Sequence, residues 1–166
     1  MRQLVRQPPE WIDRAPITVS ATREMAATPD EVWAVLAAHE RWPEWFDAIE
    51  RAEGTGGDGL GSTRSDWFRK WRLDEVFIVW DEPTVFGFVV VAAAGPLGRF
   101  SQTLLERVDV QVLTTDRVRV TYLQGFEARS KIAARLLAVA SRGMHKALHG
   151  ALEGLAAQVE RERSAD

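Results

Sequence analysis

The chain has 166 residues, of which 46% are hydrophobic and 27% charged, and its formal net charge is −3. This length suits one domain that can bury a core, and the composition excludes a wholly disordered chain. The negative charge argues against binding nucleic acid by bulk electrostatic attraction, and the absence of cysteine excludes disulfides and thiolate chemistry. Because no apolar run approaches the ~18 residues of a membrane span, we expect a soluble, cytoplasmic protein.

Residues 1–16 are polar and contain three prolines, so we expect them to form an arm on the surface of a single domain that spans residues 17–166. The segment Thr28-Pro29-Asp30-Glu31 places threonine, proline and glutamate at the positions of a capping box, which predicts the start of a helix. That helix should end before Pro43, and a short second helical turn should follow over residues 43–47.

The glycine-rich stretch 54–61 satisfies the spacing G-x-G-x-x-G of dinucleotide-binding proteins. That motif needs a helix directly afterwards to direct its N-terminus at the phosphates. Residues 62–68 instead have the pattern of a short strand, and no Gly-Lys-Ser/Thr of a P-loop is present. We therefore interpret the stretch as a flexible hairpin loop, and we predict no cofactor. We also predict no metal site, because we do not interpret any two histidines as a ligand pair of the His-x-x-x-His type.

Six segments are expected to be β-strands, separated by short turn signals: residues 17–26, 62–68, 72–81, 85–94, 99–112 and 117–126. In the last of them, Val118, Val120 and Tyr122 should point inward. Residues 86–91 are apolar without alternation, and a strand of this kind must be covered on both faces. Either the arm that carries Trp11 or a second subunit of a homodimer would supply the outer cover.

The segment 129–163 is predicted to be one helix of roughly 50 Å. It has a continuous apolar stripe, formed by Leu137, Met144, Leu148, Leu152, Leu155 and Val159. Its first half carries only basic charges: Arg129, Lys131, Arg135, Arg142 and Lys146. This basic half is either a solvated face or a contact for an anionic partner such as a membrane surface. Gly143, Gly150 and Gly154 predict either close approach of another surface or a bend that would make the helix a gate.

The order of these elements resembles that of the START-like, helix-grip superfamily, specifically the polyketide cyclase/dehydrase and lipid-transport family. The resemblance runs through Ala27–Trp33, Arg41–Trp45, Gly61–Arg64, Glu75-Val76 before Asp81-Glu82-Pro83, and the terminal helix. It implies an α+β fold in which a curved antiparallel sheet of about seven strands wraps round the C-terminal helix, with two short helices after the first strand. It also implies a cavity for a hydrophobic small molecule, but no single reaction.

We predict that the protein binds or carries a lipid, a polyketide or another apolar or aromatic metabolite. A cyclase/dehydratase-type enzyme and a partner- or membrane-binding module are the alternatives. The candidate ligand contacts come from the helix pair, the sheet and the long helix: Trp33, Trp45, Arg64, Phe77, Phe88, Phe100, Tyr122, Leu137, Met144, His145 and Leu148.

Three of these expectations are open. Arg64 is either an inward anchor for a carbonyl or carboxylate or a solvated surface charge, and we favour the surface. The seven tryptophans are either core residues or rings that line the cavity. His145 would serve as a general base if it met Tyr122, Glu75 or Arg64 in the cavity, but no catalytic residue is assigned from the sequence.

Overall fold

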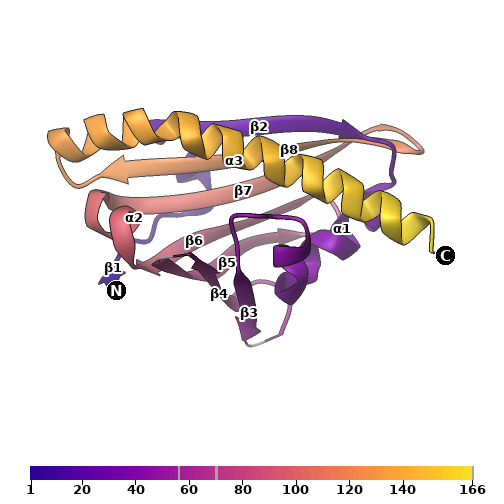
Figure 1. Ribbon diagram of the computed structural model, residues 1–166, viewed down its shortest axis with the longest axis horizontal. Helices are drawn as coiled ribbons and strands as arrows, with labels where there is room; N and C mark the ends of the chain where they lie inside the picture. Colours follow the sequence, from indigo (N-terminus) through magenta and orange to yellow (C-terminus); the bar gives the residue numbers. More distant parts are fainter. Residues whose placement is uncertain (56, 70, 166) are drawn as a thin grey trace.

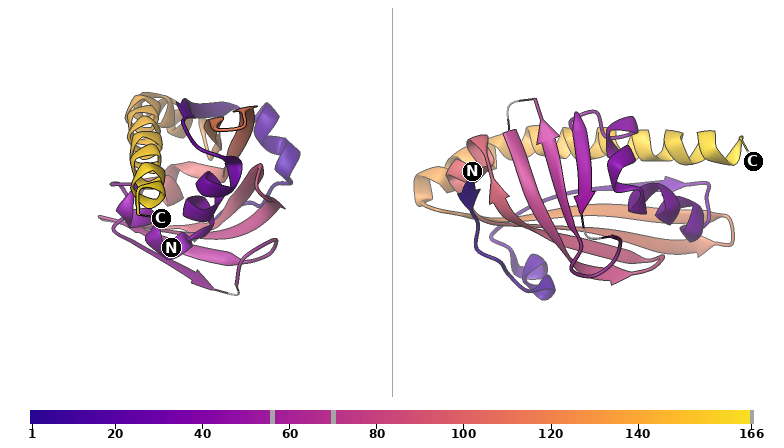
Figure 2. Two further views of the ribbon diagram at one scale, coloured as in Figure 1. Left: turned by 90° about the vertical axis from the view of Figure 1, so that its right-hand side faces the viewer. Right: turned by 90° about the horizontal axis from the view of Figure 1, so that it is seen from below.

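The computed structural model describes residues 1–55, 57–69 and 71–165 (Figure 1). Over these residues eight antiparallel strands form one sheet, in the order β2-β8-β7-β6-β5-β4-β3, with β1 paired to β6. The strands are β1 (Arg2–Gln3), β2 (Ile17–Met25), β3 (Arg51–Thr55), β4 (Thr63–Phe68), β5 (Trp71–Asp81), β6 (Val85–Ala93), β7 (Ser101–Thr114) and β8 (Arg117–Ala128). The sheet curves around the C-terminal helix α3 (Lys131–Arg163), so the predicted helix-grip α+β fold is confirmed (Figure 2).

The first helix, α1 (Pro29–Ala37), begins at the predicted capping box. The Thr28 hydroxyl accepts a hydrogen bond from the Glu31 amide at 3.3 Å, and the Glu31 carboxylate accepts one from the Thr28 amide at 2.7 Å. The second is a 3₁₀ helix, η2 (His39–Glu44), which begins four residues before the predicted turn. The Trp42 indole donates to the Leu36 carbonyl at 2.8 Å, and this bond folds η2 directly back on α1.

The sequence pattern predicts a turn or loop for two segments that lie between strands. Residues 95–98 were expected to be a turn before a strand from residue 99, but they belong to α2 (Gly95–Phe100). Gly95 reverses the chain at φ 69°, and Pro96 then occupies a helical N-terminal position where its missing N–H costs nothing. Phe100 therefore ends a helix instead of starting a strand. The predicted hairpin loop does join β3 to β4, although Gly56 within it lies outside the described residues.

The N-terminal residues first extend the sheet and then cross to its outer face. The Leu4 amide donates to the Val91 carbonyl at 2.9 Å beside the β1–β6 pairing. A 3₁₀ turn, η1 (Pro9–Arg14), then packs Trp11 and Ile12 on outward side chains of the strands, among them Leu105. Figure 2 shows this turn on the side of the sheet away from α3. Trp11 and Ile12 thus cover the outer face over β7 and β8, beside β6, the strand that holds the residues 86–91 that the sequence pattern required to be covered.

Helix α3 begins at Ser130, whose hydroxyl accepts a hydrogen bond from the Ala133 amide at 3.1 Å. The predicted stripe is buried at Leu137, Leu148, Leu152, Leu155 and Val159, and half-buried at Met144. Figure 1 shows the helix lying alongside β2 and ending near α1. None of the helices within the described ranges is long and apolar enough to cross a membrane.

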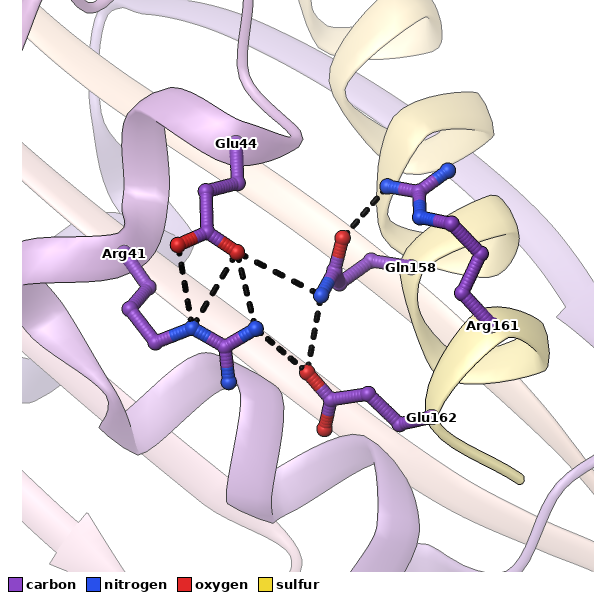
Figure 3. Close-up of polar contacts among 5 residues, drawn as sticks. All are labelled: Arg41, Glu44, Gln158, Arg161 and Glu162. Carbon is purple, nitrogen blue, oxygen red and sulfur yellow. Dashed lines mark hydrogen bonds and ion pairs between the residues drawn. The ribbon is translucent and has the colours of Figure 1, made fainter. Parts of the chain in front are cut away.

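The C-terminal half of α3 is anchored to η2. Gly154 lies directly against the backbone carbonyl of Trp45, where a Cβ atom would overlap the carbonyl oxygen. Further along α3, Gln158 lies about one turn and Glu162 about two turns beyond Gly154. Arg41 donates to Glu44 and pairs with Glu162 at 2.8 Å, and Gln158 donates to the same Glu162 carboxylate at 2.8 Å (Figure 3). The close approach predicted from the glycines therefore occurs at Gly154, whereas Cβ atoms at Gly143 and Gly150 would meet open space.

Candidate functional site

A cavity of about 210 Å³ lies between the concave face of the sheet and the middle of α3. Most of its lining is apolar, and five polar side chains are grouped within it. The lining residues are Phe46, Ala48, Ile49, Asp66, Phe68, Trp71, Leu73, Glu75, Leu97, Leu104, Glu106, Tyr122, Gln124, Phe126, Gly143, Met144, Ala147 and Leu148. An enclosure of this kind suits a largely apolar molecule that is oriented by a few polar contacts.

Strand alternation brings the polar groups of the cavity together. On β7, Glu106 occupies an inward position between Leu104 and Val108, and the register sets it opposite Gln124 of β8. On β4 and β5 the register sets Arg64 directly opposite Glu75. Acidic side chains from three strands therefore converge on one part of the concave face.

Arg64 holds two of these acids in place. Its Nη2 lies 2.7 Å from Glu75 Oε2, and its Nε lies 3.1 Å from Asp66 Oδ2. The guanidinium carbon also lies 3.7 Å from the centroid of the Trp42 ring, within cation–π range. Arg64 is 1% exposed. The expectation of a surface charge was therefore wrong, because Ser62, Arg64 and Asp66 are the inward residues of this segment.

Burial controls the ionisation of the acids. It raises the pKa of Asp66 and the pKa of Glu75, in each case against the opposing effect of Arg64. Burial also lowers the pKa of Arg64, but Asp66 and Glu75 outweigh it, so the guanidinium stays charged. The acid cluster therefore keeps protons at pH values where exposed carboxyl groups have lost theirs.

Tyr122 and Glu106 form a second buried pair. The Tyr122 hydroxyl donates to Glu106 Oε2 at 2.5 Å. Burial raises the pKa of Glu106, although the bond from Tyr122 works in the opposite direction. The pKa of Tyr122 is raised well above its ordinary value by burial and then by the neighbouring Glu106. This pair can donate or accept a proton inside an apolar cavity.

The candidate residues named from the sequence fall into three groups. Tyr122, Met144 and Leu148 line the cavity. A second group is buried or half-buried in the surrounding core without being part of the lining: Trp33, Trp45, Arg64, Phe77, Phe88, Phe100 and Leu137. Of the seven tryptophans, Trp71 is in the lining, and the others lie in the core, on the outer face or under arginine side chains: Trp33, Trp42, Trp45 and Trp80 in the core, Trp11 in the outer cluster, and Trp67 under Arg51 and Arg72.

His145 forms the third group, because it is exposed on α3 and its Nδ1 lies 2.8 Å from the Ser20 carbonyl oxygen. Its Nε2 lies 3.1 Å from Nε2 of His149, one helical turn away. His145 and His149 have the spacing His-x-x-x-His, so the premise that no two histidines form such a pair was wrong. The imidazole of His145 is not part of the cavity lining, so Tyr122 and the acids are the groups placed for proton transfer.

Three polar lining residues were missed as site residues: Asp66, Glu106 and Gln124. One signal for Glu106 was present in the sequence. It interrupts an otherwise apolar inward row on a strand, and an acid in such a row is either paired or functional. Asp66 shares a face with Arg64, so assigning that arginine to the surface also removed its neighbour from consideration.

Comparison with known proteins places this geometry in a family. Residues 16–160 match the family model described as polyketide cyclase / dehydrase and lipid transport. The chain belongs to this family. The family resemblance predicted from the sequence is therefore confirmed over most of the chain.

Solved structures of the same fold differ widely in sequence. A START superfamily protein from Mycobacterium smegmatis superposes with a TM-score of 0.71 at 13% identity, over 87% of this chain and 97% of that one. The Zhui aromatase/cyclase from a Streptomyces species superposes with a TM-score of 0.67 at 18% identity, over 87% of this chain and 93% of that one. At these identities the likeness shows the shared fold alone.

A curated relative is closer in sequence but matches a shorter segment. An uncharacterized protein of Mycobacterium tuberculosis is 33% identical over 81 residues, which make up 47% of this chain and 48% of that protein. The match thus spans about half the length of the relative.

Proposed function

We propose that the protein binds or carries an apolar small molecule, such as a lipid, a polyketide or another aromatic metabolite, in the cavity beneath α3. In this proposal residues 17–166 are the ligand-binding domain and residues 1–16 are an arm that covers the outer face of its sheet. The observation that carries the proposal is the largely apolar cavity of about 210 Å³ with polar groups in one part of its wall. Membership of a family described by polyketide chemistry and lipid transport supports it.

Filling the cavity is expected to abolish ligand binding. Ala147 lines the cavity from α3, so Ala147→Trp would place an indole ring in the space of the ligand. We expect native mass spectrometry of the purified protein to show a co-purified apolar molecule that this variant retains at least about tenfold less. Ala157→Trp, at an exposed position of the same helix, is the matched control. Equal retention in both variants would contradict the proposal.

A cyclase/dehydratase-type enzyme is the second candidate, and the buried Tyr122–Glu106 pair favours it. General acid–base chemistry contributes typically about 10²- to 10⁴-fold in rate. If the co-purified molecule is converted on incubation, Tyr122→Phe should slow its conversion by about 100-fold and weaken its binding much less. Time-resolved mass spectrometry of the extracted molecule measures the rate, and an unchanged rate would remove this pair as the catalytic group.

Exposed apolar residues on α3 favour contact with a membrane during ligand transfer. Ile132 and Val139 are 71% and 76% exposed, and Leu136 between them is 45% exposed. Their spacing places them on one side of the helix, beside the exposed cations Arg135 and Arg142. An apolar strip flanked by basic residues is typical of helices that lie on anionic membranes.

Removing that strip is expected to weaken binding to anionic vesicles. We expect Ile132→Ser combined with Val139→Ser to lower vesicle binding at least about tenfold, because such binding scales with the apolar area that the helix buries in the membrane. Sedimentation with phosphatidylserine-containing vesicles measures this, and binding should fall further as salt is added. Val112→Ser changes an exposed apolar residue of the sheet and is the control. Binding that is insensitive to salt and to both substitutions would rule out the membrane contact.

A further inference from the structure

The cavity has more acidic side chains around it than basic side chains to neutralise them. Asp66, Glu75 and Glu106 line it, and Arg64 is the cation that pairs with two of them. The lining residues from α2, from α3 and from the segment between η2 and β3 are uncharged, and Tyr122 adds a neutral hydroxyl. Behind the cluster, His39 packs on Phe77 and burial lowers its pKa to about 4, so it is neutral at pH 7 and supplies no charge.

One oxygen of this cluster has no partner. Asp66 is 1% exposed, and while its Oδ2 pairs with Arg64, its Oδ1 has no hydrogen-bond partner. A buried carboxylate oxygen left without a donor is costly. The Nη1 of Arg64 is also without a hydrogen bond, but Arg64 is not part of the lining and its guanidinium lies on the Trp42 ring. The group that would complement this cavity is therefore a hydrogen-bond donor with positive charge.

We propose that the ligand of this cavity is an apolar amine, bound as its ammonium ion by Asp66 and Glu106 with its apolar part among the surrounding side chains. This inference rests on the proposed binding function. An ammonium group has three N–H donors and one positive charge, which match the unpartnered Asp66 oxygen and the excess of acid. A carboxylate ligand would be repelled by the same groups, and a neutral alcohol would supply one donor without charge.

Proton release should accompany binding. Because burial raises the pKa of Asp66, Glu75 and Glu106, these acids hold their protons to higher pH than exposed carboxyl groups do. An ammonium ion favours the ionised acids and displaces those protons. The affinity for the amine should therefore rise with pH until the amine itself loses its proton, at about pH 10.

A matched series of ligands tests the charge preference. Phenylbutylamine, phenylbutanol and phenylbutyrate share one skeleton and differ in the polar group alone. Isothermal titration at neutral pH should give the amine an affinity at least about tenfold above that of the alcohol, with the carboxylate weakest. Titration of the amine in buffers of different ionisation enthalpy should show proton release, whereas titration of the alcohol should not.

Substitutions assign the preference to the acids. Asp66→Asn should lower the ratio of amine to alcohol affinity at least about fivefold. Asp74→Asn changes an acid of β5 that bonds Ser65 and Arg72 outside the cavity lining, and it should leave the ratio unchanged. If Asp66→Asn does not fold, as judged by circular dichroism, Glu106→Gln is measured by the same ratio.

The outcomes separate this inference from the function on which it rests. Alcohol binding as tight as amine binding, or amine binding without proton release, would overturn the amine proposal and leave the apolar cavity function standing. If none of the three compounds binds, both are overturned. A ratio that neither Asp66→Asn nor Glu106→Gln changes would also overturn the proposal, because the acids would then not recognise the amine.

Discussion

Replacing Arg64 with methionine is expected to lower the free energy of unfolding at pH 7 by about 3–5 kcal/mol. Methionine retains apolar contact with Trp42 but leaves the carboxylates of Asp66 and Glu75 buried without a cation. Chemical unfolding with urea measures the loss. Arg72→Met is the control. Arg72 pairs with a partly exposed Asp74, so this substitution should lower the free energy of unfolding by less than about 1 kcal/mol.

The loss at Arg64 should depend on pH. Without the guanidinium, the pKa values of Asp66 and Glu75 rise further above those of the unfolded chain, because the effect that lowers them is gone. A carboxyl group with a raised pKa stabilises the fold at low pH, and this stabilisation is lost as pH rises through the folded pKa. The stability of the variant relative to wild type should therefore fall as pH rises and recover as pH is lowered.

A double variant distinguishes orphaned charge from lost packing. Glu75→Gln combined with Arg64→Met removes one of the stranded carboxylates, so it should be more stable at pH 7 than Arg64→Met alone. A double variant that is less stable than the single variant, or an Arg64→Met loss that does not vary with pH, would show that packing dominates at this position.

Two glycine substitutions in α3 are expected to have opposite effects. Gly154→Ala would place a methyl group on the carbonyl oxygen of Trp45, which belongs to the backbone and cannot rotate away. We expect this substitution to lower the free energy of unfolding by about 1–3 kcal/mol. Gly150 lies on the same helix, and a Cβ atom there would meet open space. Gly150→Ala should therefore raise the free energy of unfolding by about 0.5–1 kcal/mol, because alanine has the higher helix propensity. Thermal and urea unfolding check both, and effects of the same sign would show that the contact at Trp45 is not tight.

Local sequence signals predicted most of the fold because they act within a few residues. The capping box at Thr28 places the start of α1, and the alternation through Val118, Val120 and Tyr122 correctly assigns the inward face of β8. The α2 helix was missed because glycine followed by proline marks turns as readily as helix starts.

The site was harder to predict because it depends on register between distant strands. Arg64 and Glu75 meet only when β4 and β5 pair in the observed register, and Glu106 comes from a strand about thirty residues further along the chain. Alternation gives two possible inward faces for β4, and nothing local chooses between them. In the observed register Arg64 pairs with two acidic side chains. These ion pairs explain why a charged residue is buried at this position.

The anchoring of the C-terminal half of α3 also sets the orientation of its first half. Gly154 rests on Trp45, and Glu162 is held by Arg41, so this half of the helix cannot rotate about its axis. Each residue turns a helix by about 100°. Inserting or deleting one residue between Leu148 and Gly154 would therefore swing Met144 away from the cavity while every lining side chain remained in the sequence. The number of residues that separates the anchor from the cavity is as much a part of the binding site as the side chains that line it.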